Sequence, residues 1–294
     1  MLTPSDPPPP EISIGMPVYN GEKTIANAIS SILEQTYFNF ELIISNNAST
    51  DSTAKICEYF SSIDSRIRYS ERAQNIGGAG NFKHVLERAT ASYFMWAASD
   101  DLWEPNWIEE LLPVSQKFFC LANGNCVEIN FDGTVSNHIA SGYQFSFTGN
   151  PDQNRKQFFL TPSFLGTVNA IYGIAPTQIF KEMFSKLNGP HGDITFLYSL
   201  LSKYQIRLNQ KTTRYVRLQP NFLPDPRQVK STKKLTLRYH VTYFPNMVRT
   251  VLKSVYFCDY WRHSSNSERV MLLFRSPLVI IRAMVVILQS KIRA

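Results

Sequence analysis

Short apolar segments alternate with amphipathic ones over the first 110 residues, and this alternation constrains the fold more than any other feature. The apolar segments have strand length and are rich in β-branched and aromatic residues, at 11–18, 40–45, 67–71 and 92–98. Helical patterns separate them, at 22–36, 49–60 and 80–89. Strands and helices that alternate at this spacing require right-handed crossovers. We therefore predict an α/β fold with a mostly parallel sheet and helices on both faces.

The pattern changes after about residue 118. Two Gly-containing segments, NGN at 123–125 and FDGT at 131–134, are typical of turns, and predict antiparallel hairpins. Helical patterns follow at 155–165 and 176–187, and another helix is predicted to begin at Asp193. The predicted organisation has four parts: a disordered Pro-rich tail at 1–10, one half of a domain at 11–115, the other half of the same domain at 116–226, and a basic helical segment at 227–294.

Basic charge is concentrated at the C-terminal end. Residues 227–294 contain thirteen Lys and Arg against Asp259 and Glu268. Within them, the apolar segment 277–288 would form a helix of roughly 18 Å, too short to span a bilayer but suited to lie on an anionic membrane. The alternative is a core helix packed on the domain. Motifs of common nucleic-acid readers are absent, and the N-terminus does not resemble a signal peptide, so we expect a cytoplasmic protein at the inner face of the cell membrane and no nucleic-acid partner.

Two adjacent carboxylates, Asp100 and Asp101, follow the apolar segment 92–98 after one residue, Ser99. Open α/β sheets bind their ligands beyond the carboxyl ends of the strands, where such a pair could hold a hard divalent cation against a phosphate. Alternatively, either Asp could cap the helix predicted for residues 104–112, because Asp is frequent before a first turn that contains Pro. These two residues do not by themselves decide between the two interpretations.

Four motifs occur in an order and spacing that resemble a family 2 glycosyltransferase with the GT-A fold, a Rossmann-like fold: IGMPVYNGEKTI at 14–25, ELIISNNASTDST at 41–53, NIGGAGN at 75–81 and ASDDLW at 98–103. The resemblance covers about residues 11–225, and it implies that 11–115 is the nucleotide-sugar-binding half of the domain and 116–226 the acceptor-side half. It implies an inverting, metal-dependent enzyme that moves a sugar from a nucleotide-sugar, expected to be a UDP-sugar, to an acceptor hydroxyl. A glycan or lipid-linked acceptor in the assembly of cell-surface polysaccharide or glycolipid is implied as well.

The resemblance also implies roles for individual residues. Asp101 would be the ligand of Mn²⁺ or Mg²⁺, and Asp100 would face the ribose or a metal-bound water. Asp193 would be the base that deprotonates the acceptor hydroxyl. Tyr19 would stack on the nucleobase. The residues expected to contact the donor are Pro17, Tyr19, Asn46, Asn75, Gly77, Asp100 and Arg217.

Three positions depart from the family pattern. Asn46 stands where an Asp commonly accepts a hydrogen bond from uracil, Ala98 replaces the first Asp of Asp-x-Asp-Asp, and Gly80 replaces a frequent Arg. These departures leave open a catalytically degenerate, membrane-associated scaffold that binds nucleotide without turnover. A nucleotidyltransferase on a similar sheet, with attack at the α-phosphate, is the other alternative.

Overall fold

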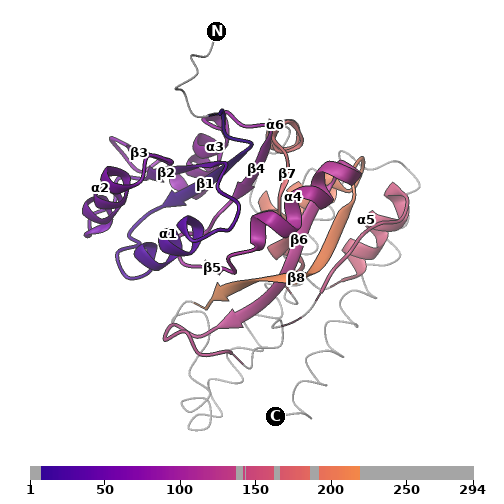
Figure 1. Ribbon diagram of the computed structural model, residues 1–294. Helices are drawn as coiled ribbons and strands as arrows, with labels where there is room; N and C mark the ends of the chain where they lie inside the picture. Colours follow the sequence, from indigo (N-terminus) through magenta and orange to yellow (C-terminus); the bar gives the residue numbers. More distant parts are fainter. Residues whose placement is uncertain (1–7, 137–141, 143, 162–165, 186–191, 219–294) are drawn as a thin grey trace.

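The structure, a computed structural model, describes residues 8–136, 142, 144–161, 166–185 and 192–218 (Figure 1). The predicted basic segment 227–294 and most of the predicted N-terminal tail lie outside these described residues.

The larger sheet contains the four strands predicted from the alternation. They are β1 (Ile12–Val18), β2 (Phe40–Asn46), β3 (Ile67–Glu71) and β4 (Tyr93–Trp96), and a short strand β7 (Ala175–Pro176) adds to one edge. The strand order is β3-β2-β1-β4-β7. The first four strands are parallel, and β7 is antiparallel to β4. The predicted mostly parallel sheet is confirmed, and Val18 pairs in register with Asn46, so the carboxyl ends of β1 and β2 meet at one edge.

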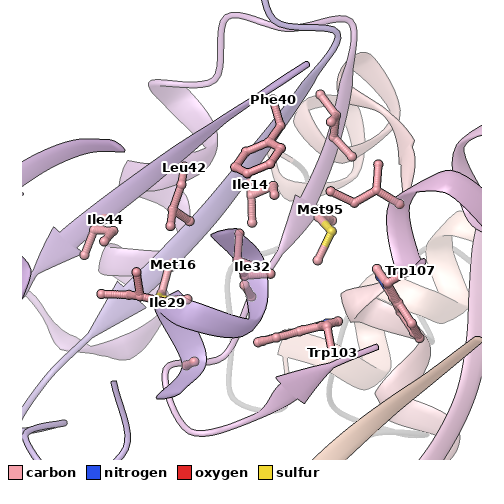
Figure 2. Packing of buried hydrophobic residues seen from close by; sticks show 14 of the residues in the cluster. Ile14, Met16, Ile29, Ile32, Phe40, Leu42, Ile44, Met95, Trp103 and Trp107 are labelled. Carbon is pink, nitrogen blue, oxygen red and sulfur yellow. The ribbon is translucent and has the colours of Figure 1, made fainter. Parts of the chain in front are cut away.

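Helices cover both faces of this sheet, as we predicted from the alternation of strands and helices. One core cluster packs α1 (Ile25–Leu33) and α4 (Trp107–Phe118) against strand residues such as Ile14, Leu42 and Met95 (Figure 2). On the other face, Phe94 and Trp96 pack with α3 (Gly77–Glu87), α6 (Thr177–Ser185) and α7 (Gly192–Leu200). Successive residues of β4 thus point into different clusters, Met95 into the first and Phe94 and Trp96 into the second, which is why this strand is apolar. The remaining helices are α2 (Thr53–Ile63), α5 (Pro151–Leu160) and the 3₁₀ helix η2 (Thr167–Tyr172).

A second sheet has the order β5-β8-β6 and extends the molecule beside the first (Figure 1). β5 (Leu102–Trp103) runs antiparallel to β8 (Ile206–Arg217), whereas β6 (Leu121–Ile129) runs parallel to β8. The predicted turn at 123–125 is wrong, because Gly124 lies inside β6 at an irregularity in its pairing with β8. The predicted turn at 131–134 is confirmed: Asn130 N donates to Thr134 O, and Gly133 has φ +88°.

Packing explains why Gly124 belongs to a strand. A Cβ at this position would lie 2.8 Å from Thr212 O and still closer to the ring of Trp107. Glycine therefore lets β8 and α4 approach β6, which is a recognised reason for glycine inside a strand.

We expect Gly124→Ala to lower the free energy of unfolding by about 1–3 kcal/mol, because the added methyl group overpacks a site bounded by backbone and a buried ring. Urea denaturation measures the change. Gly78→Ala is the matched control: a Cβ there meets nothing within 4 Å, and Ala favours the α3 helix by up to about 1 kcal/mol. Equal stability of the wild type and Gly124→Ala would contradict the packing argument.

Candidate functional site

Most of the predicted donor-binding residues lie at the carboxyl ends of the central strands. Tyr19 directly follows β1 and is 50% exposed, so its ring is accessible to a ligand. Pro17 is buried within β1, paired in register with Ser45 of β2. Asn46 ends β2 and is fully buried; its Oδ1 accepts from Ser49 N at 3.1 Å, and its Nδ2 donates to the Tyr69 hydroxyl at 3.2 Å. The Asn46 amide therefore holds the loop after β2 in place.

The side chain of Asn47 joins this loop to the start of α3, a role that was not predicted from the sequence. Its Oδ1 accepts from Ile76 N at 2.9 Å, and its Nδ2 donates to Asn75 Oδ1 at 2.9 Å. Asn75 Oδ1 also accepts from Gly77 N at 2.8 Å, and Gly77 has φ +77° with open space around its Cα. Asn75 and Gly77 thus form the turn expected beside the donor, and their contact with a donor stays a prediction.

Asp100 and Asp101 follow β4 but differ in their surroundings. Asp100 is partly exposed, whereas Asp101 is 3% exposed. Asp101 Oδ1 accepts from Arg217 N at 3.0 Å, and its Oδ2 lies 3.6 Å from Arg214 Nη1. Burial raises the pKa of Asp101 to about 7, against the opposing effect of the nearby Arg214 guanidinium. Asp101, which the family resemblance assigns to a metal, therefore also contacts β8 and holds this strand in place.

The helix-cap interpretation of the carboxylate pair is wrong. α4 begins at Trp107, and the residue at its N-cap is Asn106. Asp101 precedes this cap by five residues and points toward β8, as its contacts with Arg217 and Arg214 establish. The carboxylate pair therefore lies before the start of α4 and does not cap it.

Arg217, the last residue of β8, lies beside the carboxylate pair, and its contact with the donor stays a prediction. Its Nε donates to the Asp100 carbonyl oxygen at 3.0 Å, and its Nη1 donates to the Phe131 carbonyl oxygen at 2.6 Å. Two backbone carbonyl oxygens, one of them that of Asp100, therefore fix the Arg217 guanidinium. Arg214, three residues earlier on the same strand, has no side-chain exposure. The sequence does not reveal this burial, because the residue pattern of β8 does not indicate which of its basic side chains points inward.

Asp193 lies in the first turn of α7, as predicted, and its Oδ1 accepts from Ile194 N at 2.8 Å. Asp193 and the carboxylate pair both affect one residue, Tyr172 at the end of η2. Burial raises the pKa of the Tyr172 hydroxyl; Arg214 opposes this shift, and the charges of Asp101, Asp100 and Asp193 add to it. The charges of Asp193 and of the carboxylate pair thus act on the same tyrosine, and the role of Asp193 as the base stays a prediction.

The residues present fit a hard divalent cation. Among the described residues, no group of three or more His, Cys, Asp or Glu side chains could enclose a metal ion. Mg²⁺ and Mn²⁺ at phosphate sites usually take only one or two protein carboxylates and complete their shell with phosphate and water oxygens. Asp100 and Asp101 supply this number of carboxylates, in a position open on the Asp100 side.

In the part of the chain that the structure describes, no helix is both long and apolar enough to cross a membrane.

Comparison with known proteins agrees with this arrangement. The family model "Glycosyl transferase family 2" matches residues 13–173, more than half of the chain. A glucosyltransferase of Escherichia coli, UDP-Glc:alpha-D-GlcNAc-diphosphoundecaprenol beta-1,3-glucosyltransferase WfgD, is 35% identical over 131 residues, which are 44% of this chain and 51% of that protein. Glycosyltransferase GlyG of Streptococcus pneumoniae is 37% identical over 101 residues, 34% of this chain and 33% of that protein. The matches therefore span about a third to a half of these relatives.

Solved structures extend the similarity to the fold. The crystal structure of residues 1–349 of S. aureus TarS in complex with UDP-GlcNAc has a TM-score of 0.59 to this chain at 14% identity, and the match covers 90% of this chain and 70% of that one. The same TarS residues in complex with UDP give a TM-score of 0.58. The predicted GT-A fold is confirmed by this likeness. With the carboxylate pair at the carboxyl end of β4 and a family model over residues 13–173, the chain belongs to glycosyl transferase family 2.

Proposed function

We propose that this protein is an inverting, metal-dependent glycosyltransferase that moves a sugar from a UDP-sugar to an acceptor hydroxyl. The observation that carries the proposal is the group formed by Asp100, Asp101 and Arg217 at the carboxyl edge of the sheet, with the accessible ring of Tyr19 beyond the end of β1. A metal ion held by the two carboxylates, together with the Arg217 guanidinium, would neutralise the charge of a diphosphate. A nucleobase needs a flat apolar surface, which the Tyr19 ring offers. Membership of family 2 and the UDP and UDP-GlcNAc complexes of TarS support the choice of donor.

Each residue has a defined part in the proposed reaction. Asp100 and Asp101 would hold Mg²⁺ or Mn²⁺, which when bound would stabilise the charge on the departing diphosphate. Asp193 accepts the proton of the acceptor hydroxyl as that oxygen forms a bond to the anomeric carbon of the sugar. The bond from the anomeric carbon to the diphosphate oxygen breaks on the opposite side, so the configuration inverts. Arg217 adds positive charge near the leaving group.

One assay distinguishes this proposal from its alternatives. The protein is incubated with Mn²⁺, a panel of nucleotide-sugars and an extract of bacterial lipid-linked glycans, and the products are separated by chromatography. Release of a nucleoside diphosphate supports glycosyl transfer. A parallel incubation supplies a nucleoside triphosphate and a sugar phosphate in place of the nucleotide-sugar, and release of pyrophosphate there would identify a nucleotidyltransferase instead. Binding of UDP with no product from any donor would favour the degenerate scaffold, which Asn46, Ala98 and Gly80 suggest.

The proposed acceptor is a glycan carried on a lipid at the inner face of the cell membrane. Two observations support this choice: the name of the E. coli relative includes a diphosphoundecaprenol substrate, and residues 227–294 carry thirteen Lys and Arg. Each basic residue that reaches an anionic surface contributes about 1 kcal/mol to membrane binding. A few such contacts, together with the apolar segment 277–288, would localise the enzyme beside its acceptor.

We expect the full chain to float with vesicles that contain phosphatidylglycerol and to stay unbound with neutral vesicles, because the attraction is electrostatic. Sucrose-gradient flotation measures this binding, and 1 M salt should weaken it. Substituting Gln for Arg275, Arg282, Lys291 and Arg293 together should reduce the floated fraction several-fold. The membrane proposal is wrong if neutral and anionic vesicles bind the chain equally, or if the substituted chain floats like the wild type; a soluble acceptor would then be the better proposal.

A further inference from the structure

Arg214 is the most deeply buried charged side chain near the carboxylate pair, and the reaction proposed above gives it no role. Its exposure is 0%. Its Nη1 lies 3.6 Å from Asp101 Oδ2, its Nη2 donates to Cys126 Sγ at 3.9 Å, and its Cζ lies 4.2 Å from the centre of the Tyr172 ring. Among the described residues, its Nε and Nη1 have no hydrogen-bond partner. Burying a guanidinium with unused donors is costly, and an apolar side chain of similar size would often stabilise the fold better.

The strand pairing explains why Arg214 reaches Asp101 from inside the molecule. Arg214 pairs in register with Trp103 of β5 on one side and with Cys126 of β6 on the other. Asp101 directly precedes β5, so its carboxylate lies near the same part of β8. Three residues further along this strand, the Arg217 backbone N–H donates to the other Asp101 oxygen at 3.0 Å. β8 therefore contacts both oxygens of the Asp101 carboxylate.

We propose that Arg214 is a positioning residue that fixes the orientation of Asp101 for the metal site. The inference rests on the metal-dependent function proposed above. Side chains that contact a metal ligand from behind commonly set its orientation, and their loss typically lowers metal affinity 10–100-fold. The Tyr172 ring of η2 packs against the Arg214 guanidinium, so η2 and β8 together fix the Arg214 side chain.

Charge repulsion and positioning make opposite predictions, which makes the proposal testable. A guanidinium close to a cation site repels the cation, so if Arg214 acted only through its charge, its removal would strengthen metal binding. If Arg214 orients Asp101, its removal weakens metal binding. A role in stability alone would change the unfolding transition and leave the metal affinity of the folded protein unchanged.

The experiment measures Mn²⁺ affinity directly by electron paramagnetic resonance, with UDP at saturation and no sugar transfer. We expect Arg214→Met to weaken Mn²⁺ binding about 10–100-fold. Arg214→Lys keeps the charge but loses the planar fork, so it should weaken binding less, by several-fold. The matched control is Arg66→Met. Arg66 also contacts an aromatic ring and a carboxylate: its Cζ lies 4.4 Å from the centre of the Phe40 ring, and its Nη2 lies 2.7 Å from Asp64 Oδ2. It lies before β3, at the amino ends of the parallel strands, away from the carboxylate pair. This control should bind Mn²⁺ like the wild type.

The outcomes separate this inference from the function on which it rests. If the wild-type protein binds UDP equally well with and without Mn²⁺, the metal-dependent function is wrong. If the wild type requires Mn²⁺ and Arg214→Met binds it as tightly or more tightly, the positioning role is overturned and the function stands. If Arg214→Met does not fold, as judged by its circular dichroism spectrum, Arg214→Lys decides: wild-type Mn²⁺ affinity in that variant overturns the proposal, and weakened affinity supports it.

Discussion

Asp101→Asn should abolish the metal-supported binding of UDP while the protein stays folded. Asn keeps an oxygen that can accept from Arg217 N, so the contact between β8 and the loop after β4 survives. The substitution removes the negative charge, and Mg²⁺ and Mn²⁺ strongly prefer carboxylate oxygen over amide oxygen in such sites. It also leaves the buried Arg214 guanidinium, 3.6 Å away, without its carboxylate, so the variant should be less stable than the wild type in the absence of ligand. The loss of ligand binding is therefore measured as the change that UDP and Mn²⁺ cause within each protein.

Thermal unfolding with and without UDP and Mn²⁺ measures this loss. A ligand at a hundred times its Kd stabilises a protein by about 2.7 kcal/mol, and Asp101→Asn should lose this gain. Asp64→Asn is the control, since Asp64 also pairs with an arginine, Arg66 at 2.7 Å, but lies before β3 at the amino ends of the parallel strands. If UDP with Mn²⁺ stabilises Asp101→Asn as much as the wild type, Asp101 is not the metal ligand, and the partly exposed Asp100 becomes the candidate.

Asp193→Ala should reduce the turnover number about 10²–10⁴-fold and leave donor affinity nearly unchanged. A general base contributes this much to rate because it accepts a proton only as the new bond forms, and it adds little to binding in the ground state. Both quantities are measured on the donor identified by the nucleotide-sugar panel, the first by steady-state kinetics and the second by UDP titration.

A control is needed because Asp193 also accepts from a backbone N–H at the start of α7. Asp152 occupies the first turn of α5, so Asp152→Ala removes an acidic residue from a comparable position at a helix start. That variant should lose a little stability and keep its turnover. If Asp193→Ala behaves in the same way, Asp193 serves the helix and the base must be another residue.

Parts of the candidate site were predictable because their signals are local. The carboxylate pair follows an apolar strand, and Asn75 and Gly77 form a glycine-rich turn before a helix, so neighbours in sequence define both features. The difference between Asp100 and Asp101 was not predictable. It arises from β8, which follows more than a hundred residues later and buries one carboxylate while leaving the other partly exposed.

The sequence by itself determined the parallel sheet of β1 to β4, the helices between them and the edge where the polar residues collect. Hydrophobic periodicity is a short-range property, and parallel strands place their carboxyl ends together whatever the other contacts are. Only the tertiary structure decided that Gly124 lies in a strand, that Asn47 joins β2 to α3 and that Arg214 is buried against Asp101. Each of these depends on which distant segment packs against the residue: α4 and β8 against Gly124, the turn before α3 against Asn47, and the loop before β5 against Arg214. Such long-range contacts satisfy buried polar groups and fill space between elements, and they leave no periodic signal in the chain.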